Sequence, residues 1–159
     1  MSRDALFQLG MGAVLLNASQ TEEQIRVRTT NAVQAQADHF IERDGVICAG
    51  SHLIIDLYDA GRLDDIDHIE QTLIECVDAA GATLLHLHLH PFEPNGGVSG
   101  VAVLAESHIS IHSWPERGYA ALDVFMCGDA QPERCVDILR KAFKPARVAV
   151  KELLRGKGA

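Results

Sequence analysis

The chain has 159 residues, of which 47% are apolar and 23% are charged, and its formal net charge at pH 7 is -8. This length and composition favour one globular domain whose core needs no disulfides. The negative charge argues against binding to nucleic acid or to an anionic membrane surface, and it makes a cationic small molecule the more natural ligand.

The cysteines form no CxxC pair and show no spacing typical of a disulfide framework. They are Cys48, Cys76, Cys127 and Cys135. We therefore predict reduced thiols and a cytoplasmic location. The apolar residues 11–16 are too few for a membrane span, and no basic cluster precedes them as it would in a signal peptide.

The first part of the chain, residues 1–45, is predicted to be a partly helical N-terminal extension of a domain that spans residues 46–159. Residues 1–20 are mixed in composition and predict an arm or a disordered leader. A helix is predicted from Thr21 to about Arg43, because a start signal at Thr21 precedes residues rich in Ala, Gln, Glu and Arg. Few strong hydrophobes recur there, so this helix is expected to pack lightly or against a partner subunit.

A strand, a helix and a second strand are predicted next. Ser51–Tyr58 is an apolar run typical of a strand buried on most of its length. Asp56 within it requires a hydrogen bond or a function, because a buried carboxylate without a partner is costly. Asp64–Ala80 has apolar residues at helical spacing and ends at Gly81. Thr83–His90 alternates strictly, with three leucines on one face and three histidines on the other.

The second half of the chain is rich in predicted strands. Residues 91–97 form a loop by their Pro and Gly content, and a turn is expected at residues 115–118. Strands are expected at Val98–Ala105, Ser107–Ser113, Tyr119–Cys127 and Val148–Val150, with a helix at Gln131–Phe143. This order of elements predicts an α+β fold, in which helices cover one face of a largely antiparallel sheet.

Histidines line the polar faces of two of these strands. In residues 107–113, alternation with isoleucines places His108, Ser110 and His112 on one face. The second strand carries His86, His88 and His90. Together they leave a zinc or other divalent metal site open as an alternative. Because alternate residues of a strand lie roughly 6.6–7 Å apart, which is far for one ion, we predict no metal.

Five short motifs follow one another between residues 97 and 128. They are Gly97–Gly100 (GVSG), Glu106–His108 (ESH), Ile111–Glu116 (IHSWPE), Gly118–Ala121 (GYAA) and Asp123–Gly128 (DVFMCG). In order and spacing they resemble the small prokaryotic S-adenosylmethionine decarboxylase proenzymes, and a looser similarity extends from about Ser51 to about Glu152. The resemblance implies a two-layer α/β sandwich whose processed protomers pair into homodimers.

The same resemblance implies that the chain cleaves itself between Glu106 and Ser107. Ser107 would attack the carbonyl of Glu106, and elimination and hydrolysis would leave a pyruvoyl group at position 107 that forms a Schiff base with the substrate amine. Ser99 and His112 match family residues that assist this processing, His112 as its acid or base. The pyruvoyl carbonyl would be the electron sink that decarboxylation of an amino acid requires.

Further residues match family positions around the substrate. Cys127 matches the proton donor, for which a thiol is suited because its pKa lies nearer neutrality than that of a hydroxyl. Glu116 matches the glutamate that binds the ribose hydroxyls of S-adenosylmethionine. Phe92 and Trp114 are nearby aromatic side chains that can stack on adenine or the sulfonium. Asp56 stands where the family often has a glutamate in its first strand.

The predicted reaction is decarboxylation of S-adenosylmethionine to the aminopropyl donor for polyamine (spermidine) biosynthesis. Pyridoxal phosphate is not expected, because no phosphate-binding glycine loop is evident and the few lysines cluster near the C-terminus. The loop at residues 91–97 is one residue longer than usual, and His86 and His88 have no family counterpart. The first alternative is therefore the same chemistry on ornithine or arginine. A non-catalytic regulatory paralogue is the second, although retention of Ser107, His112 and Cys127 argues against it.

Overall fold

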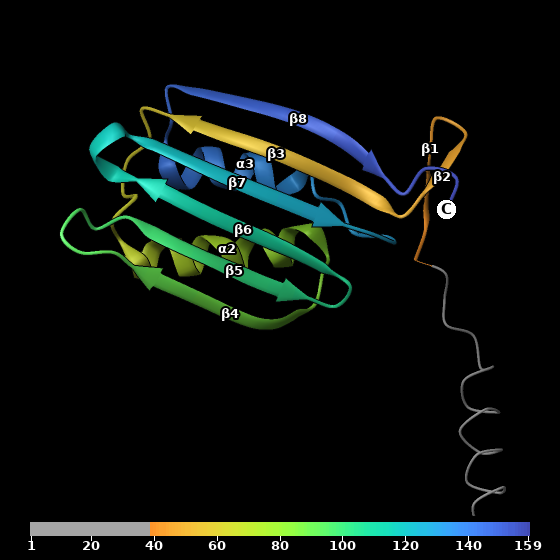
Figure 1. Ribbon diagram of the computed structural model, residues 1–159, viewed down its shortest axis with the longest axis horizontal. Coiled ribbons are helices and arrows are strands. Elements are labelled where there is room, and N and C mark those ends of the chain that lie inside the picture. The colour runs from red at the N-terminus through yellow and green to blue at the C-terminus, as the bar shows by residue number, and fades with distance from the viewer. Residues whose placement is uncertain (1–38) are drawn as a thin grey trace, which may run out of the picture. The chain divides into compact units, whose positions relative to one another are not determined.

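The computed structural model describes residues 39–159, which form a six-stranded antiparallel sheet, two helices and a small hairpin (Figure 1). The sheet has the strand order β4-β5-β6-β7-β3-β8. Its strands are β3 (Gly50–Tyr58), β4 (Leu84–Pro91), β5 (Val98–Leu104), β6 (Ser107–Trp114), β7 (Tyr119–Met126) and β8 (Arg147–Arg155). Both helices lie on the same face of the sheet. The predicted α+β fold is thereby confirmed, and β8 is longer than the three residues expected.

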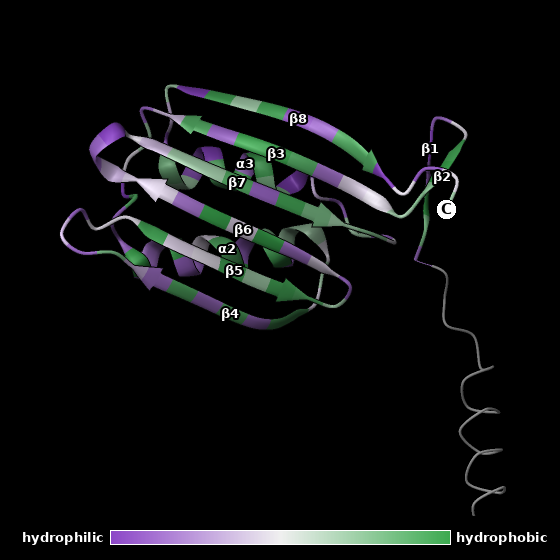
Figure 2. Ribbon diagram, viewed as in Figure 1, coloured by the Kyte–Doolittle hydropathy of each residue, from purple (hydrophilic) through white to green (hydrophobic). Residues whose placement is uncertain are grey.

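Alternation along the strands separates a face covered by the helices from an opposite face, here named the open face. In β3, Leu53, Ile55 and Leu57 are buried, while the residues between them are half-buried. Strand β7 repeats the pattern with Leu122 and Val124 buried. Figure 2 shows apolar and polar residues alternating along the same strands. The open face therefore carries the polar side chains that sequence alternation assigns to one side.

Helix α2 (Ile66–Ala80) connects β3 to β4, and its ends follow from local sequence. Asp65 accepts a hydrogen bond from the backbone N–H of His68 at 3.0 Å, which is a typical N-cap. The Arg62 side chain, together with that N–H, lowers the pKa of Asp65. Gly81 ends the helix with a φ of 74°, in the left-handed region that glycine adopts without strain. The predicted start at Asp64 was two residues early, because Asp64 and Asp65 precede the helix.

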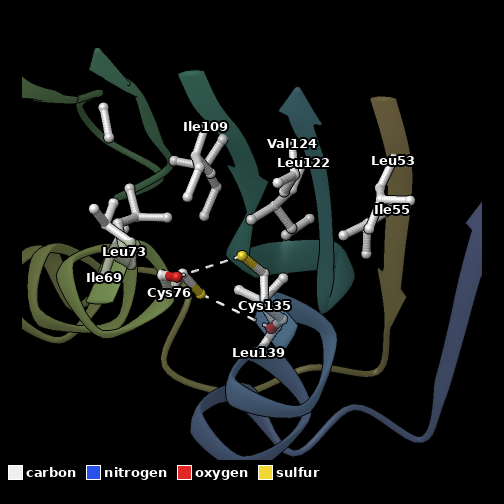
Figure 3. Packing of buried hydrophobic residues seen from close by; sticks show 14 of the residues in the cluster. Leu53, Ile55, Ile69, Leu73, Cys76, Ile109, Leu122, Val124, Cys135 and Leu139 are labelled. Atoms are coloured by element: carbon white, nitrogen blue, oxygen red, sulfur yellow. Dashed lines mark hydrogen bonds between the residues drawn. The ribbon is translucent and has the colours of Figure 1, made fainter. Parts of the chain in front are cut away.

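The core lies between the sheet and the helices α2 and α3 (Arg134–Phe143), as Figure 3 shows. Ile69 and Leu73 of α2 and Leu139 of α3 are at most 1% exposed. Burial of each such side chain contributes about 1.5–3 kcal/mol relative to exposure. The helices also meet through two buried thiols, because Cys76 and Cys135 each donate to the other's backbone carbonyl, at 3.8 and 3.6 Å. Contact with Cys135 and burial raise the pKa of Cys76, so this thiol stays protonated.

Strand β4 differs from its prediction at one residue. The pairing with β5 shifts register between Leu84 and His86, so that Leu85 forms a bulge and is 64% exposed. Leu84, Leu87 and Leu89 pack against the core, so Leu84 takes the place that was expected for Leu85. The sequence alternates without a break, but the bulge shifts the pairing and changes which leucine faces the core at the start of the strand.

The N-terminal part also requires a correction. Ile41–Arg43, expected to end a helix, form strand β1, which pairs with β2 (Val46–Cys48) around the Asp44-Gly45 turn. His39 and Phe40, also within that predicted helix, belong to no helix or strand. Residues 21–38 of the predicted helix, the arm of residues 1–20 and the apolar residues 11–16 lie outside the described residues. Neither α2, with 15 residues, nor α3, with 10, has the length and apolar character needed to span a bilayer.

Candidate active site

A two-residue turn joins β5 to β6 and presents the peptide bond between Glu106 and Ser107. Leu104 pairs with Ser107 across the hairpin, so Ala105 and Glu106 alone make the reversal. Glu106 has a φ of 67°, a left-handed conformation that costs a non-glycine residue of the order of 1 kcal/mol or more. Backbone strain therefore coincides with the peptide bond that the sequence singles out.

Three residues meet at this turn, and we name them the cleavage cluster: Glu106, Ser107 and Cys127. The Ser107 Oγ lies 3.5 Å from the Cys127 Sγ and accepts the Cys127 backbone N–H at 3.4 Å. The Cys127 thiol in turn donates to the carbonyl oxygen of Glu106 at 3.2 Å. A hydroxyl, a carbonyl and a thiol that can polarise that carbonyl are thus in contact.

Cys127 differs from the other cysteines of the chain in its exposure. Cys48, Cys76 and Cys135 are 0% exposed, whereas Cys127 is half-buried, and all four are free thiols. A buried thiol in apolar surroundings is inert, while a partly exposed one can exchange a proton with a ligand. Cys127 is therefore the cysteine suited to proton transfer.

Ser99 and His112 form a second group, here named the histidine pair. They are directly opposite each other in the register of β5 and β6, and the Ser99 Oγ lies 2.7 Å from the His112 Nδ1. Ser99 is half-buried and His112 is exposed on the open face. The hydroxyl orients the imidazole, whose Nε2 has no hydrogen-bond partner among residues 39–159 and can therefore act as an acid or a base.

The cleavage cluster and the histidine pair lie at opposite ends of β6. Ser107 is the first residue of the strand and His112 is five residues further on. At about 3.3 Å per residue, this separation is roughly 16 Å. Within one chain, Ser107 and His112 are therefore not in contact, although the family resemblance assigns both to one reaction.

The residues expected around the substrate lie at the histidine end of the sheet. Trp114 stacks on Tyr119 with ring centroids 5.3 Å apart, and its own ring lies 6.4 Å from that of His112. The Tyr119 hydroxyl donates to Asp56 at 2.6 Å. This hydrogen bond and partial burial raise the pKa of Tyr119 to about 12. Asp56 thus has the partner that its position in a strand required, and Tyr119 is a member of the group that sequence reasoning missed.

Phe92 and Glu116 come from the loops that flank this end. Phe92 is 50% exposed and meets His90 edge-on, with ring centroids 4.8 Å apart. His90 pairs with Ser99, which links the loop to the histidine pair. Glu116 lies in the 3-10 turn η1 (Pro115–Arg117), where it is exposed and forms no hydrogen bond or ion pair with another of residues 39–159. Its carboxylate is therefore available to a ligand.

Between the two ends, the open face carries a network that the sequence did not reveal. Asp123 is bonded to the His52 Nε2 at 3.2 Å and to the Ser110 hydroxyl at 3.2 Å. The ring of His108 packs 6.1 Å from that of His52, and burial, followed by His52, lowers the pKa of His108. In the described part of the chain, no three histidine, cysteine, aspartate or glutamate side chains converge as a metal site would require.

One contact at the cleavage cluster comes from the N-terminal segment. The His39 Nε2 lies 3.2 Å from a carboxylate oxygen of Glu106, and the His39 carbonyl accepts the N–H of Gly128 at 2.7 Å. No sequence signal pointed to His39, because the contact is long-range and lies in no recognised motif.

Comparison with known proteins finds a matching family, similar sequences and a similar solved structure. The profile of the family described as S-adenosylmethionine decarboxylase matches residues 51–156. A protein of Thermomicrobium roseum named S-adenosylmethionine decarboxylase proenzyme is 45% identical over 108 residues, which cover 67% of this chain and 93% of that protein. A protein of Methanococcus maripaludis with the same name is 48% identical over 110 residues, covering 67% and 89%. The crystal structure of the adenosylmethionine decarboxylase from Aquifex aeolicus superimposes with a TM-score of 0.62 at 35% identity, over 69% of this chain and 92% of that one.

Proposed function

The chain belongs to the S-adenosylmethionine decarboxylase family, and from this premise we propose that it cuts itself between Glu106 and Ser107 and then decarboxylates S-adenosylmethionine. The product is the aminopropyl donor for polyamine (spermidine) biosynthesis. The observation that carries the proposal is the contact of the Ser107 hydroxyl, the Cys127 thiol and the Glu106 carbonyl at one strained turn.

Cleavage begins with the hydroxyl of Ser107. Its oxygen attacks the carbonyl carbon of Glu106, the C–N bond breaks, the nitrogen gains a proton, and an ester replaces the amide. Loss of the Ser107 α-proton then releases the Glu106 carboxylate by elimination. Water hydrolyses the carbon–nitrogen bond that remains, so that the nitrogen leaves as ammonia and a carbonyl takes its place. The thiol of Cys127 lies where negative charge develops on the carbonyl oxygen, which supports a stabilising role for it in the first step.

The residues around position 107 fit a pyruvoyl group. Such a group supplies a covalently attached carbonyl that accepts the electron pair left behind when the carboxylate departs as carbon dioxide. It would remain beside Cys127, whose Sγ already lies 3.5 Å from the Ser107 Oγ. We assign to the Cys127 thiol the delivery of a proton to the substrate α-carbon, since it is the partly exposed cysteine.

The distance between Ser107 and His112 leads us to propose a homodimer with shared sites. If two open faces meet about a two-fold axis that lies between the sheets and crosses the strands, the cleavage cluster of one protomer faces the histidine pair of the other. Each dimer then holds two complete sites. Exposed apolar side chains on the open face support this packing, because Val103, Trp114 and Leu153 are 39–41% exposed.

The substrate would lie at these shared sites. We propose that Glu116 accepts hydrogen bonds from the ribose hydroxyls, since a carboxylate can accept both bonds of a vicinal diol. Trp114 and Phe92 offer exposed aromatic faces to the adenine or the sulfonium. Asp56 acts through Tyr119, which it holds against Trp114. The acidic balance of the chain favours this cationic substrate.

The substrates ornithine and arginine are not favoured, because the family and the relatives above carry the name of S-adenosylmethionine. Release of carbon dioxide from each of the three amino acids by the purified protein distinguishes them. We expect turnover with S-adenosylmethionine alone. Absence of turnover with all three substrates would favour a regulatory paralogue. A cytoplasmic location is part of the proposal and is supported by the four free cysteines.

Complementation tests the shared site. The Ser107→Ala and His112→Ala variants are each expected to be inactive alone. When one chain of each variant pairs in a mixed dimer, one of the two sites contains both an intact Ser107 and an intact His112. Random pairing in equal amounts makes half of the dimers mixed, so about a quarter of wild-type activity should return. If no activity returns on co-expression, Ser107 and His112 do not act across two protomers.

A further inference from the structure

The cleavage cluster is contacted by a segment that lies outside the family-matched residues 51–156. His39 and the hairpin of β1 and β2 precede that region. His39 nevertheless reaches both sides of the cluster: its imidazole lies 3.2 Å from the Glu106 carboxylate, and its carbonyl accepts the Gly128 N–H at 2.7 Å. The side chains of His39 and Glu106 are about half exposed, at 49% and 52%.

Gly128 shows how closely this segment packs. Its φ of 60° lies in the left-handed region, and a Cβ at this position would come within 3.2 Å of the His39 Nδ1. Gly128 directly follows Cys127, whose thiol contacts the scissile carbonyl. His39 therefore bridges the residue before the scissile bond and the residue after the thiol, which are the two segments that must stay together during cleavage.

We propose that His39 is a positioning residue for self-cleavage, a role that rests on the proposed scission between Glu106 and Ser107. Through the 3.2 Å contact of its Nε2 with the Glu106 carboxylate, and through the hydrogen bond that fixes the backbone at Gly128, it holds the Glu106 carbonyl against the Cys127 thiol and within reach of the Ser107 hydroxyl. His39 touches none of the reacting atoms. Its effect is exerted through the conformation of the turn.

A double-mutant cycle on the cleavage rate of the full chain tests this role. We expect His39→Ala and Glu106→Ala each to slow cleavage by about fivefold, which corresponds to ~1 kcal/mol for a half-exposed pair. The double variant should be no slower than either single one. His39→Gln, which keeps an N–H donor, should recover most of the rate. Arg43→Ala is the matched control, because it removes the 3.8 Å contact of the same hairpin with Glu133 and leaves Glu106 untouched.

The possible failures are distinguishable. If wild type itself is not cleaved, the proposed function falls and this role with it. If wild type is cleaved and His39→Ala is cleaved equally fast, the role of His39 alone is refuted. If His39→Ala slows cleavage as much in the Glu106→Ala background, or if Arg43→Ala slows it equally, the effect is one of general packing and the proposed contact has no role. If the His39 variants fold poorly, Glu106→Ala with His39 intact still tests the contact, because cleavage at the wild-type rate would refute it.

Discussion

Replacement of Ser99 by alanine separates a chemical role of the histidine pair from a structural one. The change removes the hydroxyl that lies 2.7 Å from the His112 Nδ1. Because His112 is exposed, water can replace the lost partner, so the free energy of unfolding should fall by only about 0.5–1 kcal/mol. If the hydroxyl orients the acid or base of self-cleavage, the rate should fall by about 10²–10³-fold, which corresponds to roughly 3–4 kcal/mol in the barrier.

Two measurements decide the matter. The time course of fragment formation gives the cleavage rate, and urea unfolding of a Ser107→Ala background, which cannot be cleaved, gives the stability. Ser99→Thr keeps the hydroxyl and suits a strand, so it should cleave within about tenfold of wild type. The reasoning is refuted if Ser99→Ala cleaves at the wild-type rate, or if it loses several kcal/mol of stability, since the loss of rate would then reflect misfolding.

Three further predictions concern single groups. Cys127→Ala protein that has been processed should decarboxylate about 10²–10⁴-fold more slowly, as a kcat measurement would reveal, and a wild-type kcat would exclude the thiol as the proton donor. The pKa of Tyr119 is raised to about 12, so its hydrogen bond stabilises the fold fully below pH 10 and that stabilisation is lost as the pH rises towards 12. Ultraviolet titration of the two tyrosines should therefore show one late phenol, which Asp56→Asn shifts to lower pH; an unchanged titration would contradict the assignment. Ser113→Ala should lower the free energy of unfolding by about 1–3 kcal/mol in a denaturant titration, because the buried Val98 N–H loses its 2.8 Å acceptor; an unchanged midpoint would contradict this.

The sheet was predictable because its strands alternate clearly. His108, Ser110 and His112 follow the face that alternation assigns, and the helix ending at Gly81 follows from apolar spacing and a glycine cap. The bulge at Leu85 was not predictable, because an inserted residue leaves the alternation of the sequence unchanged while it shifts the pairing. Strand β1 was missed because its three residues follow a helix-favouring composition.

Contacts between distant residues were the part of the site that sequence could not supply. His39 and Tyr119 reach Glu106 and Asp56 through tertiary packing, and no spacing in the chain encodes those pairs. The separation of Ser107 from His112 did have a signal. Five residues along one predicted strand imply roughly 16 Å, which already indicates that these residues cannot meet within one extended strand.

The central claim is that the chain cleaves itself at Ser107. An intact mass of the purified, denatured protein measures this directly, with Ser107→Ala as control. We predict two fragments, residues 1–106 and 107–159, the second blocked by a pyruvoyl group at its N-terminus, and a single full-length chain for Ser107→Ala. A single full-length chain for wild type as well, or scission at another bond, would contradict the account.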